Sequence, residues 1–424
     1  MGNLDYTQVL NKIENTRRFG NEPGVVVTAQ VIKVLREKGK QKRIIPYIHV
    51  AGTNGKGSVC AFFSSILKKE HMRVGTFVSP HLVDFEERIT VDGRMIPKED
   101  VTRLGNYLLD IDFGIGLTMF DYCLAMALLY FEEQQCDYMV IETGLGGRLD
   151  STNAIGTPQC AVITKIGYDH MAILGCDIAD IAAEKAGIIK ENGTVVVEQQ
   201  DKRAMQVIEQ EAKKKHARII TVEQSDIARC SGYALRLCGT FQWENAAAAE
   251  LAARYVLGKR YGVPEYEMQY DKTEPKSEKT DLNDRIKSAL EEAVWPGRME
   301  IVSKEPFLLV DGAHNSNGVD ALKESLMQMY PSEKFCFFMG VMADKDYDVM
   351  IREILPLAEE FYTVTPDSDR ALQASHLADF IRKEGVCATE LSGVDEIRKH
   401  LKRDTKNVAF GSLYFIGELK QHRI

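Results

Sequence analysis

Residues 44–58, IIPYIHVAGTNGKGS, constrain the fold of this chain more than any other stretch. The apolar run 44–50 predicts a buried strand, residues 52–58 a glycine-rich loop, and the periodic pattern of residues 59–68 a helix. A strand, a glycine loop and a helix in this order form a polyphosphate site, because loop N–H groups and the helix N-terminus point at the anion. The glycines let the backbone approach that ligand closely.

Two side chains of the loop carry the expected chemistry. Lys56 would reach the β- and γ-phosphates, and Ser58 would bind the phosphates or their Mg²⁺. The spacing departs from the G-x-x-x-x-G-K-[ST] pattern, because two residues separate Gly52 from Gly55 and Gly57 precedes the serine. An ordinary glycine turn with a solvated lysine is the alternative, and the flanking strand and helix disfavour it.

Strand and helix patterns alternate after this loop. Residues 73–79, 138–143, 160–167, 194–198 and 219–222 read as strands, residues 88–95 as a hairpin, and residues 119–135 and 178–190 as helices. Such alternation predicts right-handed crossovers and a mostly parallel sheet, with ligands bound beyond the carboxyl ends of its strands.

Polar residues lie at or just past three of these strand ends. Ser79, Glu142 and His170 offer a hydroxyl, a carboxylate and an imidazole, a set that suits Mg²⁺ if His170 binds it directly or through water. Unrelated strand caps are the alternative. Lys185, on the following helix, is a surface cation, a phosphate partner or a lysine carbamate, and the sequence leaves these three open.

A second domain begins near Trp295. Residues 258–294 form a charged insert with a short helix at 284–292, after which strands are predicted at 307–310, 334–341, 360–365 and 408–415. The fold class predicted is α/β: a P-loop-type, mostly parallel sheet flanked by helices in residues 1–296, and a smaller Rossmann-like domain in residues 297–424. Asp311 and His314 follow a strand and look like site residues. Asn245 precedes an alanine-rich helix (246–253) and is either a site residue or its cap.

Composition excludes several classes of function. The net charge of −9 argues against a nucleic-acid or membrane-surface binder. Nine cysteines without a C-x-x-C pair suit a reducing cytoplasm. The longest apolar stretch, 117–131, contains Asp121 and is too short to span a bilayer, and no signal-peptide core is found at the N-terminus. We expect a cytoplasmic monomer with no nucleic-acid or membrane partner.

With these residues collected, the chain resembles the Mur ligase superfamily, and specifically its folylpolyglutamate synthase/dihydrofolate synthase family. The matching motifs are HVAGTNGKGS, SPHL, ETGLGGRLDSTN, DHMAILG, AAEKAGIIK, GTFQWENA, WPGRME and DGAHN, with a weaker match at GSLYFIGE. They extend from His49 to Asn315, and together they are specific although no single one is.

The resemblance implies an ATP- and Mg²⁺-dependent amide ligase. It would phosphorylate the carboxylate of a folate or of dihydropteroate to an acyl phosphate, which the amine of L-glutamate attacks. Catalytic roles fall on Lys56, His170, Lys185 and His314, with Lys185 matching a carbamylated lysine. The remaining implied residues are the ATP contacts Gly52, Thr53, Asn54, Gly55, Lys56, Gly57, Ser58, Asn245, Arg298 and Asp311, the metal ligands Ser79, Glu142 and His170, and the substrate contacts Thr118, Phe120, Asp121, Leu149, Asp150 and Ser151.

Three other interpretations compete with this one. A cell-wall Mur ligase would need a whole domain before the glycine loop, where only about 43 residues stand. A related amino-acid ligase could act on another carboxylate. A non-catalytic ATP-binding protein would need no site groups in the second domain, yet Arg298, Asp311 and His314 are present.

Overall fold

The computed structural model describes residues 4–16, 20–261 and 278–422. Contacts divide the chain into two units: unit 1 comprises Met1–Ala234 and Glu244–Ala293, and unit 2 comprises Leu235–Trp243 and Val294–Ile424. The short segment Leu235–Trp243 therefore belongs to unit 2, although unit 1 residues flank it on both sides. None of the helices in the described ranges is long and apolar enough to cross a membrane.

A mixed, mostly parallel sheet forms the centre of unit 1, as predicted. Its strand order is β4-β3-β2-β5-β1-β6-β7-β8. The six strands β2, β5, β1, β6, β7 and β8 pair in parallel. The turn at Asp92-Gly93, with both residues at positive φ, closes the antiparallel hairpin of β3 and β4 at one edge. The strands are β1 (Tyr47–Ala51), β2 (Val74–Phe77), β3 (Ile89–Val91), β4 (Arg94–Met95), β5 (Tyr138–Glu142), β6 (Cys160–Ile163), β7 (Thr194–Val197) and β8 (Arg218–Thr221).

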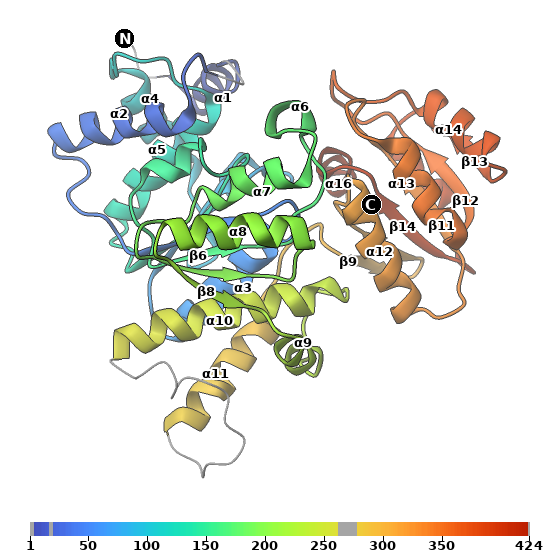
Figure 1. The fold of residues 1–424 in the computed structure, drawn as a ribbon. Coiled ribbons are helices and arrows are strands. Elements are labelled where there is room, and N and C mark those ends of the chain that lie inside the picture. Colours follow the sequence, from blue (N-terminus) through green and yellow to red (C-terminus); the bar gives the residue numbers. More distant parts are fainter. Residues whose placement is uncertain (1–3, 17–19, 262–277, 423–424) are drawn as a thin grey trace. The chain divides into compact units, whose positions relative to one another are not determined.

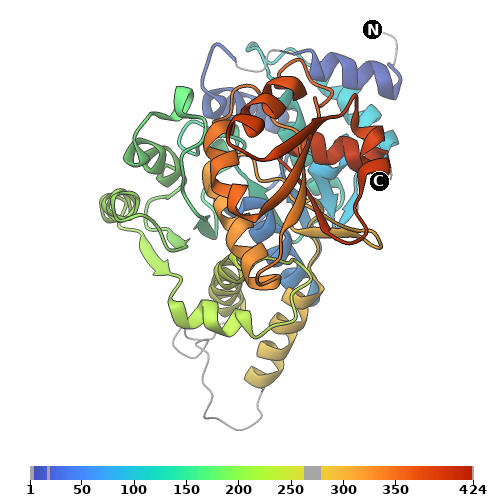
Figure 2. The same ribbon diagram turned by 90° about the vertical axis from the view of Figure 1, so that its right-hand side faces the viewer.

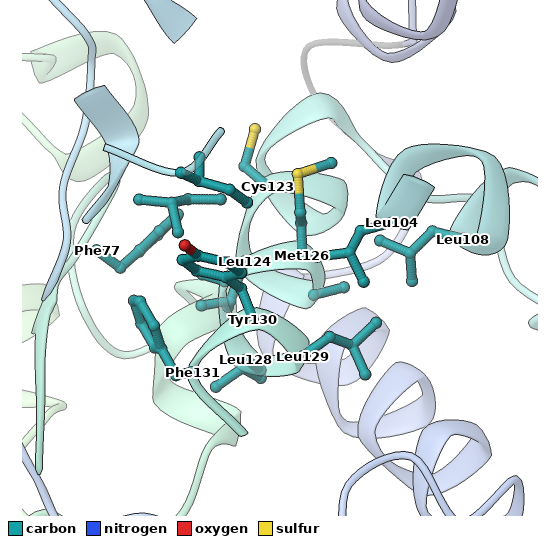
Figure 3. Packing of buried hydrophobic residues seen from close by; sticks show 14 of the residues in the cluster. Phe77, Leu104, Leu108, Cys123, Leu124, Met126, Leu128, Leu129, Tyr130 and Phe131 are labelled. Carbon is teal, nitrogen blue, oxygen red and sulfur yellow. The ribbon is translucent and has the colours of Figure 1, made fainter. Parts of the chain in front are cut away.

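Helices pack on this sheet through apolar residues that recur at helical spacing and so lie on one face of each helix. In one cluster, Phe77 of β2 packs with Phe131, Met126 and Leu104 of the helices above it (Figure 3). The helices α7 and α8 lie side by side and pack against β6 and β7 (Figure 1). The helices are α1 (Tyr6–Glu14), α2 (Gly24–Glu37), α3 (Lys56–Lys69), α4 (Lys98–Leu109), α5 (Met119–Glu133), α6 (Met171–Leu174), α7 (Ile178–Ala186), α8 (Lys202–Lys214), α9 (Gln224–Ser231), α10 (Phe241–Tyr261) and α11 (Glu278–Glu292), with short 3-10 turns η1 (Phe85–Arg88) and η2 (Ser151–Ala154).

Unit 2 is a second, smaller α/β arrangement. Its sheet has the order β13-β12-β11-β14-β10-β9, parallel except for β9, and helices flank it (Figure 2). The strands are β9 (Glu300–Lys304), β10 (Phe307–Val310), β11 (Phe335–Met339), β12 (Ala358–Thr363), β13 (Cys387–Glu390) and β14 (Lys406–Phe410), and the helices include α12 (Ser316–Met329), α13 (Tyr347–Ile354), α14 (Ala374–Lys383), α15 (Ile397–His400) and α16 (Leu413–Gln421).

Several predicted boundaries were wrong, each for a local reason. The strand predicted at 408–415 ends at Phe410, because Gly411 takes φ 123° and Ser412 caps α16. The helix predicted at 178–190 ends at Ala186. The alanine-rich helix begins at Phe241, four residues before Asn245, so the capping role considered for Asn245 is wrong. Much of the charged insert, residues 262–277, lies outside the described residues.

Candidate functional site

The glycine loop follows β1 and leads directly into α3, as the sequence predicts. The N–H of Thr53 donates to the carbonyl of Lys165 at 2.9 Å, and the Thr164 hydroxyl donates to the carbonyl of Asn54 at 2.6 Å. The segment after β6 therefore holds the loop in place from the neighbouring strand. Gly55 occupies the N-cap of α3 in the left-handed region (φ 91°, ψ −18°), where it makes no side-chain cap.

Two of the loop glycines stand where a larger residue would collide. A Cβ on Gly52 would lie 1.8 Å from the Thr164 hydroxyl, and a Cβ on Gly55 would lie 2.3 Å from Oδ1 of Asn245. Asn245 thus lies against the loop from α10, within unit 1. The sequence predicted Asn245 as a site residue from its motif alone, and the contact with Gly55 places it beside the predicted phosphate loop.

Two lysines converge on one backbone carbonyl of the loop. Nζ of Lys56 donates to the carbonyl of Gly52 at 3.1 Å and to that of Thr53 at 3.2 Å, and Nζ of Lys185 donates to the carbonyl of Gly52 at 2.8 Å. Lys185 is buried, and burial together with the charge of Lys56 lowers its pKa to about 7, against an opposing effect of Asp169. The loop therefore carries positive charge suited to phosphate oxygens, together with an amine that is readily neutral.

Two predicted metal ligands, Ser79 and Glu142, lie at the ends of the neighbouring strands β2 and β5, whereas His170 follows β6, which β1 separates from β5. The N–H of Ser79 donates to Oε2 of the buried Glu142 at 3.1 Å, and Nζ of Lys56 lies 3.9 Å from Oε1 of Glu142. His170 begins α6 at positive φ, with its Nε2 3.9 Å from Asp169. Within the described ranges no three His, Cys, Asp or Glu side chains form a ready metal cluster. One carboxylate and one hydroxyl fit Mg²⁺, which keeps several of its waters.

Three of the six predicted substrate contacts are hydrogen-bonded to one another. Thr118 caps α5 and its hydroxyl donates to Oδ2 of Asp121 at 2.7 Å, while the Ser151 hydroxyl donates to Oδ1 of Asp121 at 2.6 Å. Asp150 caps η2, and Leu149 is 44% exposed. Thr118, Asp121 and Ser151 thus form one hydrogen-bonded group, and Leu149 is an exposed apolar residue next to Asp150 in the sequence.

Phe120, the remaining predicted substrate contact, lies under the loop that follows β5. Its ring centroid is 5.5 Å from that of Phe77, edge to face. A Cβ added to Gly144 would lie 2.7 Å from the Phe120 ring, so the loop passes directly over it. The ring is thus a packing partner of the loop in unit 1.

Sequence reasoning missed two buried polar residues of unit 1. Nε2 of His49, on β1, lies 2.7 Å from the Thr152 hydroxyl, and Thr152 bonds Asp150. His49 is fully buried, and burial lowers its pKa to about 3, so it is neutral at physiological pH. A single histidine inside an otherwise apolar strand was the signal that could have found it.

In unit 2 the residues after β10 form their own polar centre. The buried carboxylate of Asp311 accepts the N–H groups of Met299 and Ala313, both at 2.8 Å, and burial raises its pKa while Arg298 opposes the rise. A Cβ on Gly312 would lie 1.9 Å from an Arg298 nitrogen. Nδ1 of His314 lies 2.8 Å from the Gly312 carbonyl. Arg298, Asp311 and His314 thus lie close together in unit 2.

The fold and these two polar centres define an enzyme of the Mur ligase class. Residues 50–253 match the Mur ligase middle domain, and residues 297–411 match the Mur ligase glutamate ligase domain. A Bacillus subtilis dihydrofolate synthase/folylpolyglutamate synthase is 33% identical over 98% of both chains. The chain belongs to the dihydrofolate synthase/folylpolyglutamate synthase family.

Solved structures agree with this assignment. A Mycobacterium tuberculosis folylpolyglutamate synthase complexed with ADP and AMPPCP has a TM-score of 0.82 at 25% identity, covering 99% of each chain. An E. coli FolC in complex with DHPP and ADP has a TM-score of 0.80 at 26% identity, covering 99% of this chain and 97% of the other. The predicted fold class and family are confirmed.

Proposed function

We propose that this protein joins L-glutamate to a folate, to dihydropteroate, or to both, in a reaction driven by ATP. The observation that supports this most directly is the glycine loop, whose Gly52 carbonyl accepts hydrogen bonds from both Lys56 and Lys185. That arrangement is suited to a nucleotide's terminal phosphates. Curated relatives carry either one activity or both in their names, which is why both acceptors are proposed.

The reaction proceeds in two steps. A carboxylate is a poor electrophile, so the γ-phosphoryl group of ATP is first transferred to the acceptor's carboxylate, with ADP leaving. The amine of L-glutamate then attacks the acyl phosphate, the C–N bond forms as the amine gives up a proton to solvent, and phosphate leaves with the electron pair of the broken C–O bond. Both steps build negative charge on phosphoryl oxygens, and cations placed in advance lower that barrier. We assign this role to Lys56 and the N–H groups of residues 52–58 other than those of Thr53 and Asn54, which donate to the Lys165 carbonyl.

Mg²⁺ would be held by Ser79 and Glu142, with His170 bound directly or through water, and would neutralise charge on the transferring phosphoryl group. We propose that Lys185 is carbamylated, because its buried amine, with a pKa near 7, is largely neutral at slightly alkaline pH and can attack CO₂. The carbamate would exchange a cation for an anion beside the loop, which suits a site that gathers Mg²⁺.

The other assignments extend the same proposal. Asn245, Arg298 and Asp311 contact ATP, and His314 serves the incoming glutamate. Thr118, Phe120, Asp121, Leu149, Asp150 and Ser151 form the wall that receives the pterin-bearing substrate. We further propose that the protein acts as a monomer in the cytoplasm.

Product mass spectrometry tests the proposed function. The purified protein is given ATP, Mg²⁺ and L-glutamate with either dihydropteroate or tetrahydrofolate, and each product is weighed. We expect a mass increase of one glutamyl residue per turn, with ADP release that requires both glutamate and the acceptor. ADP release that is unchanged when both are omitted would instead support a non-catalytic or differently coupled ATP-binding protein.

A further inference from the structure

The buried His49 has no role in the proposed chemistry, yet it sits at a junction of the site. It is on β1, three residues before Gly52, and it is fully buried. Its Nε2 lies 2.7 Å from the hydroxyl of Thr152, which is on η2. The hydrogen bond therefore joins the strand that enters the phosphate loop to the turn that carries the predicted substrate contacts.

The proton positions along this contact follow from what Asp150 accepts. Oδ1 of Asp150 accepts both the N–H and the hydroxyl of Thr152, and its Oδ2 accepts the N–H of Leu145 at 2.8 Å. Burial raises the pKa of Asp150, and these donors oppose that rise because they stabilise the ionised carboxylate. Because the Thr152 hydroxyl gives its hydrogen to Asp150, His49 must donate from Nε2. The relay thus runs in one direction, from His49 to Thr152 to Asp150.

This tautomer leaves Nδ1 of His49 as a bare acceptor. Nδ1 is buried and has no hydrogen-bond partner within the part of the chain that the structure describes. An unsatisfied buried polar atom costs about 1–3 kcal/mol. A leucine or methionine would avoid that cost in the strand. The presence of His49 is therefore explained by its other nitrogen, Nε2, whose hydrogen bond to Thr152 compensates for the unsatisfied Nδ1.

The relay ends on the wall that we assign to the folate side. Asp150 holds the N–H of Leu145, in the loop after β5, and caps η2. The next residue, Ser151, donates to Asp121. Loss of the hydrogen bonds to Asp150 would therefore loosen residues 149–151 and the loop at Leu145 together. The phosphate loop is held separately, by Thr164 and Lys165.

We propose that His49 is a positioning residue that fixes the folate-binding turn, through Thr152 and Asp150, without acting on ATP. The identity of the substrate in this inference rests on the proposed function, whereas the hydrogen-bonded relay from His49 to Asp150 does not. It predicts a split in kinetic effect: loss of the relay should weaken binding of the folate or dihydropteroate substrate and leave the use of ATP nearly unchanged.

Matched substitutions test the relay. Thr152→Val removes the hydroxyl at almost constant volume, whereas Thr152→Ser keeps it. His49→Met removes the donor, whereas His49→Gln presents an amide N–H near the position of Nε2. We expect KM for the acceptor to rise about tenfold in the first variant of each pair, because each loses at least one buried hydrogen bond of the relay, and to stay within about twofold in the second. KM for ATP should stay within about twofold throughout.

Hydrogen exchange supplies a readout that needs no activity. The backbone amides of Leu145 and Thr152 should exchange faster in Thr152→Val than in Thr152→Ser, because both donate to Asp150. Equal rates in this pair would overturn the inference, as would a rise in KM for ATP that matches the rise for the acceptor. If His49→Met does not fold, the threonine pair decides alone. An inactive wild-type protein with the predicted exchange difference would refute the proposed function and leave the relay standing.

Discussion

Substituting Gly55 with alanine should strongly impair the use of ATP. Gly55 has φ 91° at the N-cap of α3, a conformation that costs an L-residue about 1–2 kcal/mol. The new Cβ would lie 2.3 Å from Oδ1 of Asn245, about 1 Å inside ordinary contact. Overpacking of this kind costs about 1–3 kcal/mol. Together these give a loss of about 2–5 kcal/mol in the folding free energy of the loop region.

Gly39→Ala is the matched control. Gly39 also has a positive φ, 67°, but a Cβ there has nothing within 4 Å. It therefore carries the backbone cost without the collision, about 1–2 kcal/mol. A double variant, Gly55→Ala with Asn245→Ala, should recover the collision part of the stability loss and leave the backbone part.

The assay follows ADP release at saturating acceptor and glutamate, with urea unfolding measured in parallel. A loop displaced by about 1 Å should lower kcat/KM for ATP by about 100-fold in Gly55→Ala, while Gly39→Ala stays near wild type. The reasoning is refuted if Gly55→Ala uses ATP with wild-type kcat/KM and unfolds at the same urea concentration as the control.

Three further predictions concern charged groups. Lys56→Ala should abolish ligation, and a variant that turns over undiminished in the ADP-release assay would contradict the role of the loop. Lys185 should give a carbamate signal in ¹³C NMR with labelled bicarbonate, and the signal should strengthen as pH rises through about 7 because the amine then loses its proton. Lys185→Ala should lack both the signal and the activity, and small carboxylates should partly restore the activity. A bare amine under saturating bicarbonate would reject the carbamate. Asp311→Asn should lower kcat/KM for ATP at least about tenfold, because the amide has one acceptor oxygen for the N–H groups of Met299 and Ala313, and wild-type values would remove Asp311 from the site.

The sequence predicted the central sheet and the phosphate loop well, because both depend on strong local signals. Strands β1, which is apolar except for His49, and β11, which is apolar throughout, are fully buried, and the loop glycines stand between a strand and a helix. The two edge strands of the second sheet were missed for the opposite reason. β13, with the sequence CATE, is largely exposed, and β9 alternates weakly, so neither has a burial pattern that differs from a loop.

The site was predicted as a set of residues but not as a network. Motifs placed Asp121, Asp150 and Ser151 near one another, but sequence spacing cannot show that Ser151 bonds Asp121 from another element. The same limit hid His49, whose neighbour Thr152 is 103 residues away. Long-range pairing between buried polar groups depends on the sheet register, and here β1 pairs directly with both β5 and β6.

The assignment of Leu235–Trp243 to unit 2 has a practical consequence for the design of separately expressed fragments. Phe241 and Cys238 pack against the apolar centre that contains Met299, and the Thr240 amide donates to Ser325. A fragment beginning at residue 294 would leave that apolar face bare, and the Ser325 hydroxyl would keep only its hydrogen bond to the Ala321 carbonyl. Separate expression of the C-terminal lobe should therefore yield aggregating material unless a nine-residue peptide covering residues 235–243 is supplied or grafted onto it.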